Sequence, residues 1–206
     1  MKIRPTLATF ALLTSAALAG PPGYDAKAPA LPPPPIPAPS CRISYDYFEA
    51  GWNHIMPDSG SHGDGYFLSA NKSLNDHFFA LLHGGQTFMG DNTLTDVAGG
   101  IGFHAPVMNC FDWVVKTACF YEDSTYWGDN VGWDVATGIR VSLSSWLEFN
   151  TFYHASDTFE DSDGIDHAGT AALIFKDIIH PRFDTILAGV MTDQATSVSL
   201  GLRYNF

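Results

Sequence analysis

Val198-Ser199-Leu200-Gly201-Leu202-Arg203-Tyr204-Asn205-Phe206 ends the chain with a strict alternation of apolar and polar residues. Successive side chains of a strand point to opposite faces, so one face of this stretch is apolar throughout: Val198, Leu200, Leu202, Tyr204 and Phe206. The apolar face continues to the last residue, as expected where the outer side of a strand meets lipid. The stretch therefore predicts the closing strand of a transmembrane β-barrel.

Nine further strand-like runs, separated by turn signals, precede this one. In the run 131–142, for example, Val135 and Ile139 alternate with Asp134 and Arg140. The predicted fold class is all-β, an antiparallel up-and-down transmembrane barrel of ten strands, with eight as the alternative if weaker runs such as 77–84 extend loops. The expected strands are 43–53, 65–71, 77–84, 95–105, 111–121, 131–142, 145–156, 167–176, 182–191 and 196–206.

The first 41 residues form two further segments. A basic start, an apolar stretch from Leu7 to Leu18 and the small residues Ala17-Leu18-Ala19 predict a signal peptide at 1–19. Residues 20–41 are rich in proline, which cannot join a sheet and favours an extended spacer, so we expect a periplasmic linker followed by a barrel at 42–206. No other stretch has the roughly 18 apolar residues of a spanning helix.

The composition fits a wall with one apolar and one polar side, since 46% of residues are hydrophobic and only 16% are charged. The formal net charge of −12 makes nucleic acid an unsuitable partner.

If the N-terminus lies in the periplasm, the connections between successive strands alternate between the outer and the inner side of the membrane. This alternation puts Lys72, Lys176 and Arg182 on inner turns. The outer loops contain no Lys or Arg and carry the acids Asp58, Asp64, Asp91, Glu122, Asp123, Asp129, Asp157, Glu160, Asp161, Asp163, Asp166 and Asp193.

Several charged residues fall on the inward-facing side of the expected strands. A small barrel is nearly filled by its own side chains. We therefore expect the lumen to be plugged by a charge network, which satisfies polar groups inside an apolar wall, with a narrow channel as the alternative. In the first strand, Asp46 and Glu49 share a face only if a bulge lies between them. The predicted network joins Lys116, Arg140 and Arg203 to Glu49, Asp134 and Glu148.

No catalytic, metal-binding or cofactor-binding residues are predicted. A Gly-x-Ser-x-Gly phrase is lacking around Ser144 and Ser145, and no triad spacing links them to His54, His62 or His154, which leaves a surface hydrolase as a distant alternative. The acidic run 160–166 departs from the spacing of a calcium loop.

The three cysteines allow one intramolecular pairing. Cys110 lies on an expected inner turn and Cys119 nine residues further along the strand that follows, too far for a disulfide. Cys41 and Cys110 both fall on the inner side, so Cys41–Cys110 is the bridge we expect, and Cys119 is expected to face lipid.

Five phrases carry a resemblance: 47–52, 64–66, 99–104, 138–140 and 201–206. They resemble the small single-domain outer-membrane β-barrel proteins of Gram-negative bacteria, the OmpA/OmpX-like barrel class. The resemblance implies a monomeric protein of the cell outer membrane with both termini in the periplasm. It also implies a structural or surface-interaction role, and as partners outer-membrane lipids, lipopolysaccharide, periplasmic chaperones and the insertion machinery that reads the terminal signature of Leu200, Leu202, Tyr204 and Phe206.

Overall fold

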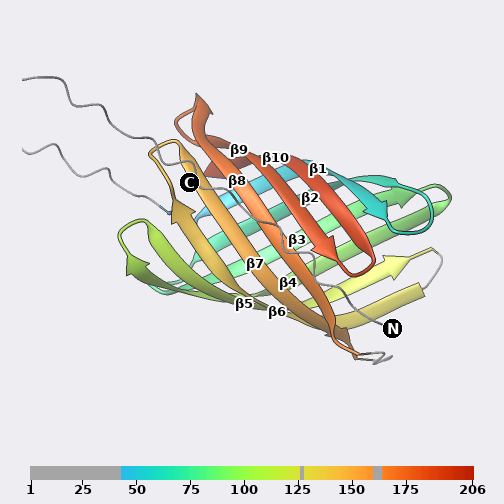
Figure 1. Ribbon diagram of the computed structural model, residues 1–206. Coiled ribbons are helices and arrows are strands. Elements are labelled where there is room, and N and C mark those ends of the chain that lie inside the picture. Colours follow the sequence, from blue (N-terminus) through green and yellow to red (C-terminus); the bar gives the residue numbers. More distant parts are fainter. Residues whose placement is uncertain (1–42, 126–127, 160–163) are drawn as a thin grey trace, which may run out of the picture. The chain divides into compact units, whose positions relative to one another are not determined.

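The computed structural model describes residues 43–125, 128–159 and 164–206 (Figure 1). Every strand pairs antiparallel with its neighbours in the chain, and β1 pairs with β10, so the sheet closes into a barrel. The all-β prediction of ten strands is confirmed and the eight-strand alternative is wrong. The strands are β1 (Tyr47–Pro57), β2 (Gly63–Ser73), β3 (Phe78–Met89), β4 (Asn92–Met108), β5 (Phe111–Ser124), β6 (Gly128–Ser142), β7 (Leu147–Thr158), β8 (Asp166–His180), β9 (Phe183–Thr192) and β10 (Ala195–Asn205).

The predicted signal peptide at 1–19 and linker at 20–41 lie outside the described residues. Among those described, no helix is long and apolar enough to cross a membrane.

Some strands are longer than the sequence pattern predicts. The outer loop expected at 85–95 is wrong, because Gly84 and Gly85 pair with Val97 and Asp96 and the β3–β4 ladder continues to Met89. Gly90 then turns the chain with a φ of 62°, a left-handed conformation that glycine adopts without steric cost. At the other end β8 continues into the inner turn expected at 176–182, as far as His180, with an irregular register after Phe175, so Lys176 lies on a strand.

The first strand begins later than predicted. The sequence pattern favours a strand from residue 43, but β10 ends at Asn205, whose partner is Tyr47, so earlier residues have no ladder on that side. The pairing of β1 is regular along both neighbours and Asp46 precedes the strand, so no bulge lies between Tyr47 and Glu49. Residues 43–46 lie outside the ladder, and Tyr45 among them is buried in the lumen.

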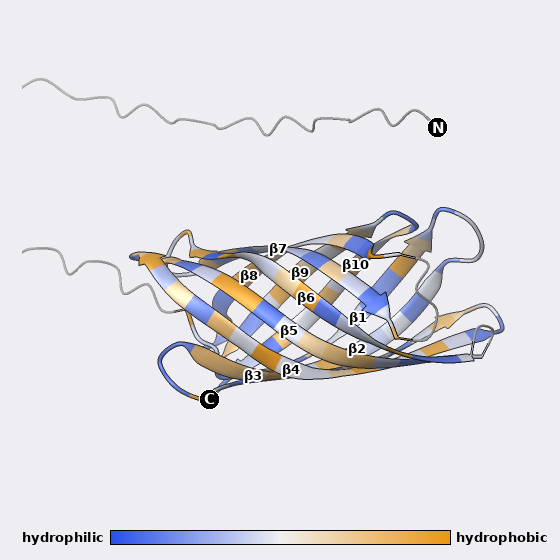
Figure 2. Cartoon of the chain, turned by 90° about the horizontal axis from the view of Figure 1, so that it is seen from below, coloured by the Kyte–Doolittle hydropathy of each residue, from blue (hydrophilic) through white to orange (hydrophobic). Residues whose placement is uncertain are grey.

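The wall has two chemically different faces. Apolar and polar segments alternate along the strands in Figure 2. Such an exposed apolar wall around a buried polar interior is the pattern of a transmembrane barrel. The outward side chains include the exposed apolar residues Trp52, Leu68, Leu82, Ile101, Trp113, Val135, Tyr153, Leu187 and Leu200, and the buried residues include Arg140, Glu148 and Arg203.

Candidate functional site

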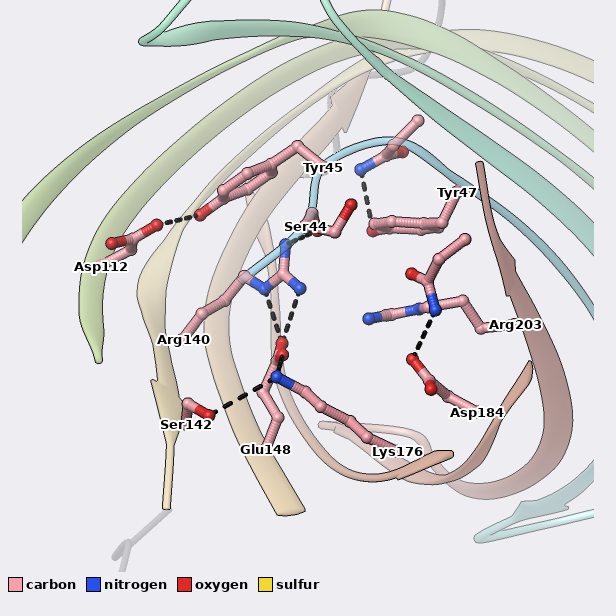
Figure 3. A network of polar contacts seen from close by, with 12 residues as sticks. Ser44, Tyr45, Tyr47, Asp112, Arg140, Ser142, Glu148, Lys176, Asp184 and Arg203 are labelled. Carbon is pink, nitrogen blue, oxygen red and sulfur yellow. Dashed lines mark hydrogen bonds and ion pairs between the residues drawn. The ribbon is translucent and has the colours of Figure 1, made fainter. Parts of the chain in front are cut away.

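A layer of buried side chains crosses the lumen near the end where β1 begins and β10 stops (Figure 3). We call this layer the septum. Its members touch one another through an unbroken series of ring contacts and ion pairs. They are Tyr45, Tyr47, Phe79, Arg140, Glu148 and Arg203, each no more than 8% exposed.

Glu148 is the electrostatic centre of the septum. Its Oε1 accepts hydrogen bonds from Arg140 Nε at 2.9 Å and from an Arg140 terminal nitrogen at 2.6 Å, and its Oε2 lies 2.9 Å from Lys176 Nζ. The other terminal nitrogen of Arg140 donates to the backbone carbonyl of Ser44 at 3.0 Å. A buried charge is tolerated only when it is paired and hydrogen-bonded, and Glu148 meets this condition on both oxygens.

A second ion pair lies beside the first. Arg203 Nε donates to Glu49 Oε1 at 2.7 Å, and Ser69 Oγ donates to the other oxygen of Glu49 at 2.9 Å. The guanidinium of Arg203 lies 4.0 Å from the centre of the Tyr47 ring, in a cation–π contact. Asn71 Nδ2 donates to the hydroxyl of Tyr47 at 2.8 Å, which fixes that ring across the lumen.

Tyr45 fills the part of the septum that the strands leave open. Its ring stacks on His104 at 4.0 Å between centroids and also packs against Phe79 at 4.7 Å. The guanidinium of Arg140 lies 4.4 Å from the centre of the ring. Its hydroxyl donates to Asp112 Oδ2 at 3.0 Å, and burial raises the pKa of that hydroxyl above its ordinary value.

We call residues 43–46, which carry Tyr45, the strap. Its last residue, Asp46, is tied to the barrel rim: the backbone N–H of Ser73 donates to Asp46 Oδ1 at 2.8 Å, and Lys72 Nζ lies 3.2 Å away. Burial raises the pKa of the Asp46 carboxyl, but the Ser73 hydrogen bond and the Lys72 charge outweigh it, so the pKa lies below its ordinary value.

Two predicted network residues have other partners. Lys116 Nζ lies 3.8 Å from the centre of the Phe152 ring, and within the described ranges no ion pair joins it to a carboxylate. Asp134 Oδ1 lies 3.1 Å from His154 Nδ1. The ion pair expected for Lys116 is therefore not found among the described residues, where Glu49 and Glu148 pair with arginines and Asp134 with His154.

Sequence reasoning missed three members of this site. The sequence pattern places Lys176 on a turn and gives no prediction for Tyr45 or Asp112. The only signal for Tyr45 and Tyr47 is their alternation with Ser44 and Asp46, which places two aromatic rings on the inward face of the chain before and at the start of β1.

Cavities lie next to the septum. A vestibule of about 650 Å³ at the β10 end is lined by Ser44, Glu148, Lys176 and Arg203, among others. Two further cavities, of about 330 and 460 Å³, are both lined by Tyr47, Glu49, Asp96 and Lys116, and the larger also by Glu122 and Asp134. Arg203 lines both the vestibule and the smaller of these cavities, so the septum between them is about one side chain thick.

The terminal signature lies on the outer surface of β10. Leu200 and Leu202 are 53% and 45% exposed, as the alternation predicts for a lipid-facing strand. Phe206 is 56% exposed, its N–H donates to the Asp46 carbonyl at 3.3 Å, and Lys72 Nζ lies 5.0 Å from the centre of its ring. The last residue of the chain is thus tied to the same rim as Asp46.

Cys110 is disulfide-bonded, and Cys119 is free and exposed on the outer face of β5. Cys41 lies outside the described residues, so the expected Cys41–Cys110 pairing stays a prediction.

The residues considered for catalysis are spread over the barrel. Ser144 and Ser145 lie in the turn between β6 and β7 at the septum end, whereas His54 lies near the opposite end with its Nδ1 2.9 Å from Asp64. His154 is engaged by Asp134. In the described part of the chain, no three His, Cys, Asp or Glu side chains converge as metal ligands would.

The comparisons with known proteins agree on the fold. No protein-family model and no curated protein sequence matches the chain. Among solved structures, the NanC porin matches with a TM-score of 0.54 and 8% identity, over 77% of this chain and 100% of that chain. The KdgM porin, in complex with disordered oligogalacturonate, has a TM-score of 0.43 and 12% identity over 77% of this chain and 99% of that chain.

Neisserial surface protein A (NspA) has a TM-score of 0.43 and 13% identity, over 79% of this chain and 98% of that chain. The NanC match and the closed antiparallel sheet define the class. The chain is a small single-domain β-barrel of the outer-membrane type.

Proposed function

We propose that this protein resides in the outer membrane as a closed barrel, with both termini on the periplasmic side and a structural or surface-interaction role. The observation that carries the proposal is the septum, in which Arg140 and Glu148 are 2% and 1% exposed and fully engaged with protein partners. Water-filled pores leave their lumenal charges accessible, whereas here the charges close the lumen. The solved structures it resembles are porins and a surface protein, which supports a role other than catalysis.

The charge distribution supports a surface role. At the end opposite the septum, the described loops and strand ends carry Asp58, Asp64, Asp91, Asp123, Asp129, Asp157, Asp166 and Asp193 and contain no Lys or Arg. A rim of this kind repels polyanions and attracts cations, including divalent ions that bridge carboxylates to lipopolysaccharide phosphates. The basic residues Lys72, Lys176 and Arg182 lie at the septum end, which we assign to the periplasm.

Two experiments test the proposal. In planar lipid bilayers, the folded wild-type protein should show no sustained conductance, whereas a steady open level would favour the alternative below. In intact cells, single cysteines at Asp193 and at Lys72, in a background without native cysteines, should react oppositely with an impermeant thiol reagent. Labelling of Lys72→Cys alone would invert the topology and remove the basis for a surface role.

A narrow channel is the second candidate. It is favoured by the thinness of the septum, since cavities lie next to it and share Arg203 in their linings. For the same lumen to conduct, a side chain of the septum must leave its place.

A further inference from the structure

We propose that the larger outer cavity, of about 460 Å³, binds a short peptide with free ends, whose carboxylate lies at Lys116 and whose ammonium lies at Glu122. The lining of this cavity runs from Tyr47, in the septum, to Leu94 and Glu122, near the outer ends of β4 and β5. The septum therefore forms its floor, and the cavity extends from there toward the acidic rim. This inference goes beyond the closed barrel proposed above, which assigns no ligand to the lumen.

The first argument is that Lys116 is a cation without a carboxylate in contact. Among the described residues that line the cavity, it is the only Lys or Arg, and its ammonium lies over an aromatic ring. The nearby charges of Arg140 and Arg203 repel it. Glu49 and Asp134 attract it, but each of these acids already has its own partner within hydrogen-bond distance. A half-buried ammonium in these surroundings favours an anionic partner, because a ring face offsets only part of its desolvation.

The second argument is the excess of negative charge at the other end of the cavity. Glu122 lies directly opposite Asp96 in the β4–β5 ladder, and like charges at such positions repel. The charges that act most strongly on Glu122 are those of Asp96 and Asp166, both of them acids. On this side of the septum, the described chain contains no Lys or Arg besides Lys116. An ammonium group placed at Glu122 would relieve the repulsion.

The third argument is the distance between the two charges, which sets the length of the ligand. Lys116 and Glu122 lie six positions apart on the same face of β5, or about 20 Å between Cα atoms. A free amino acid carries both charges on one residue and is too short to reach both side chains. An extended peptide spans about 3.3–3.6 Å per residue, so about three to five residues bridge the gap once the reach of the two side chains is included.

The fourth argument is the lining between the two charges. Asn71 and Ser156 offer side-chain donors and acceptors to peptide groups, while Leu81, Leu94 and Phe120 offer apolar contacts to the side chains of a peptide. A largely apolar lining with a few polar groups that fix orientation is typical of small-ligand sites.

Isothermal titration calorimetry on the folded full chain in detergent micelles tests this inference, with tetraalanine as the probe. Tetraalanine with free ends should bind about tenfold more tightly than either its N-acetylated or its C-amidated form. Each capped peptide loses one charge-assisted hydrogen bond, which is among the stronger kinds of hydrogen bond in proteins.

Two variants assign the two ends of the peptide. Lys116→Gln should weaken binding of the free peptide about tenfold and leave binding of the C-amidated peptide unchanged. Glu122→Gln should weaken binding of the free peptide by a similar factor and leave binding of the N-acetylated peptide unchanged. Asp123→Asn is the matched control, because Asp123 is exposed on the outward face of β5 beside Glu122, so the same charge is lost outside the cavity. This control should bind as the wild type does.

Heat-modifiable migration on gels confirms that each protein is folded before titration. No heat of binding for tetraalanine at millimolar concentrations would overturn the inference, and so would equal binding of the free and capped peptides. Tight binding of spermine that is unchanged in Lys116→Gln, with no binding of tetraalanine, would assign the acids to a polyamine and overturn the peptide site. If a variant does not fold, the capped peptides on the wild type decide.

Discussion

Replacing Glu148 by Leu should destabilise the barrel more than any other single change in its lumen. Glu148 is 1% exposed and neutralises Arg140, which is 2% exposed, together with Lys176. Lys176 can turn its flexible ammonium into the vestibule that it lines, but Arg140 is enclosed by Tyr45 and Tyr47 and cannot reach water. Leaving one buried charge without its partner costs about 3–5 kcal/mol, and we expect Glu148→Leu to fall in this range.

A double-mutant cycle separates the charge from the packing. Arg140→Met together with Glu148→Leu removes both charges and keeps apolar bulk, so the double variant should recover most of the loss, leaving about 1 kcal/mol or less for the lost Ser44 hydrogen bond. The assay is reversible urea unfolding in lipid vesicles, followed by tryptophan fluorescence. Lys72→Ala serves as the control, since its pair with Asp46 has a lysine side chain 60% exposed and is worth at most about 1 kcal/mol.

Two results would refute the reasoning. A cost below about 1 kcal/mol for Glu148→Leu would mean that Arg140 has access to water and that the septum is not dry. Additive costs in the double variant would mean that Arg140 and Glu148 do not interact in the folded barrel.

Three further predictions concern the wall, the chain end and pH. Val135 lies midway along the outer face of β6, so Val135→Arg should lower the free energy of unfolding in lipid vesicles by about 2–4 kcal/mol. Ile139 lies nearer the strand end, so Ile139→Arg should lower it by only about 0–1 kcal/mol. Equal losses would mean that the membrane is not centred on Val135. Phe206→Asp should reduce the amount of heat-modifiable, membrane-inserted protein far more than Phe206→Tyr, and equal amounts would contradict a role of the aromatic end in insertion. Burial raises the pKa of Tyr45 above its ordinary value of about 10, so its contribution to stability is present below that pH and is lost as the pH rises above it. The unfolding free energy of the wild type should therefore fall more steeply above pH 10 than that of Tyr45→Phe, and parallel curves would show that Tyr45 is not buried.

The fold could be predicted almost entirely from the sequence, because the information that sets it is local. Alternation of apolar and polar residues, as in Val135 and Ile139 against Asp134 and Arg140, fixes which side of a strand faces lipid. Turn signals between such runs favour ten strands, and the closed barrel excludes the alternative of eight. Strand ends were predicted less well, since Gly84 and Gly85 break the pattern in the sequence but are held in the ladder by β4.

The partners inside the lumen were decided by the tertiary structure alone. Alternation shows that Lys116, Arg140 and Glu148 point inward, but the height of each residue in a tilted strand, and hence its neighbours across the lumen, depends on the register of the whole barrel. Glu148 consequently meets Arg140 and Lys176, while Lys116 lies over Phe152. The strap shows the same limit: residues 43–46 continue the strand pattern in sequence, but β10 has already ended at Asn205, so without a backbone partner Tyr45 packs into the lumen instead.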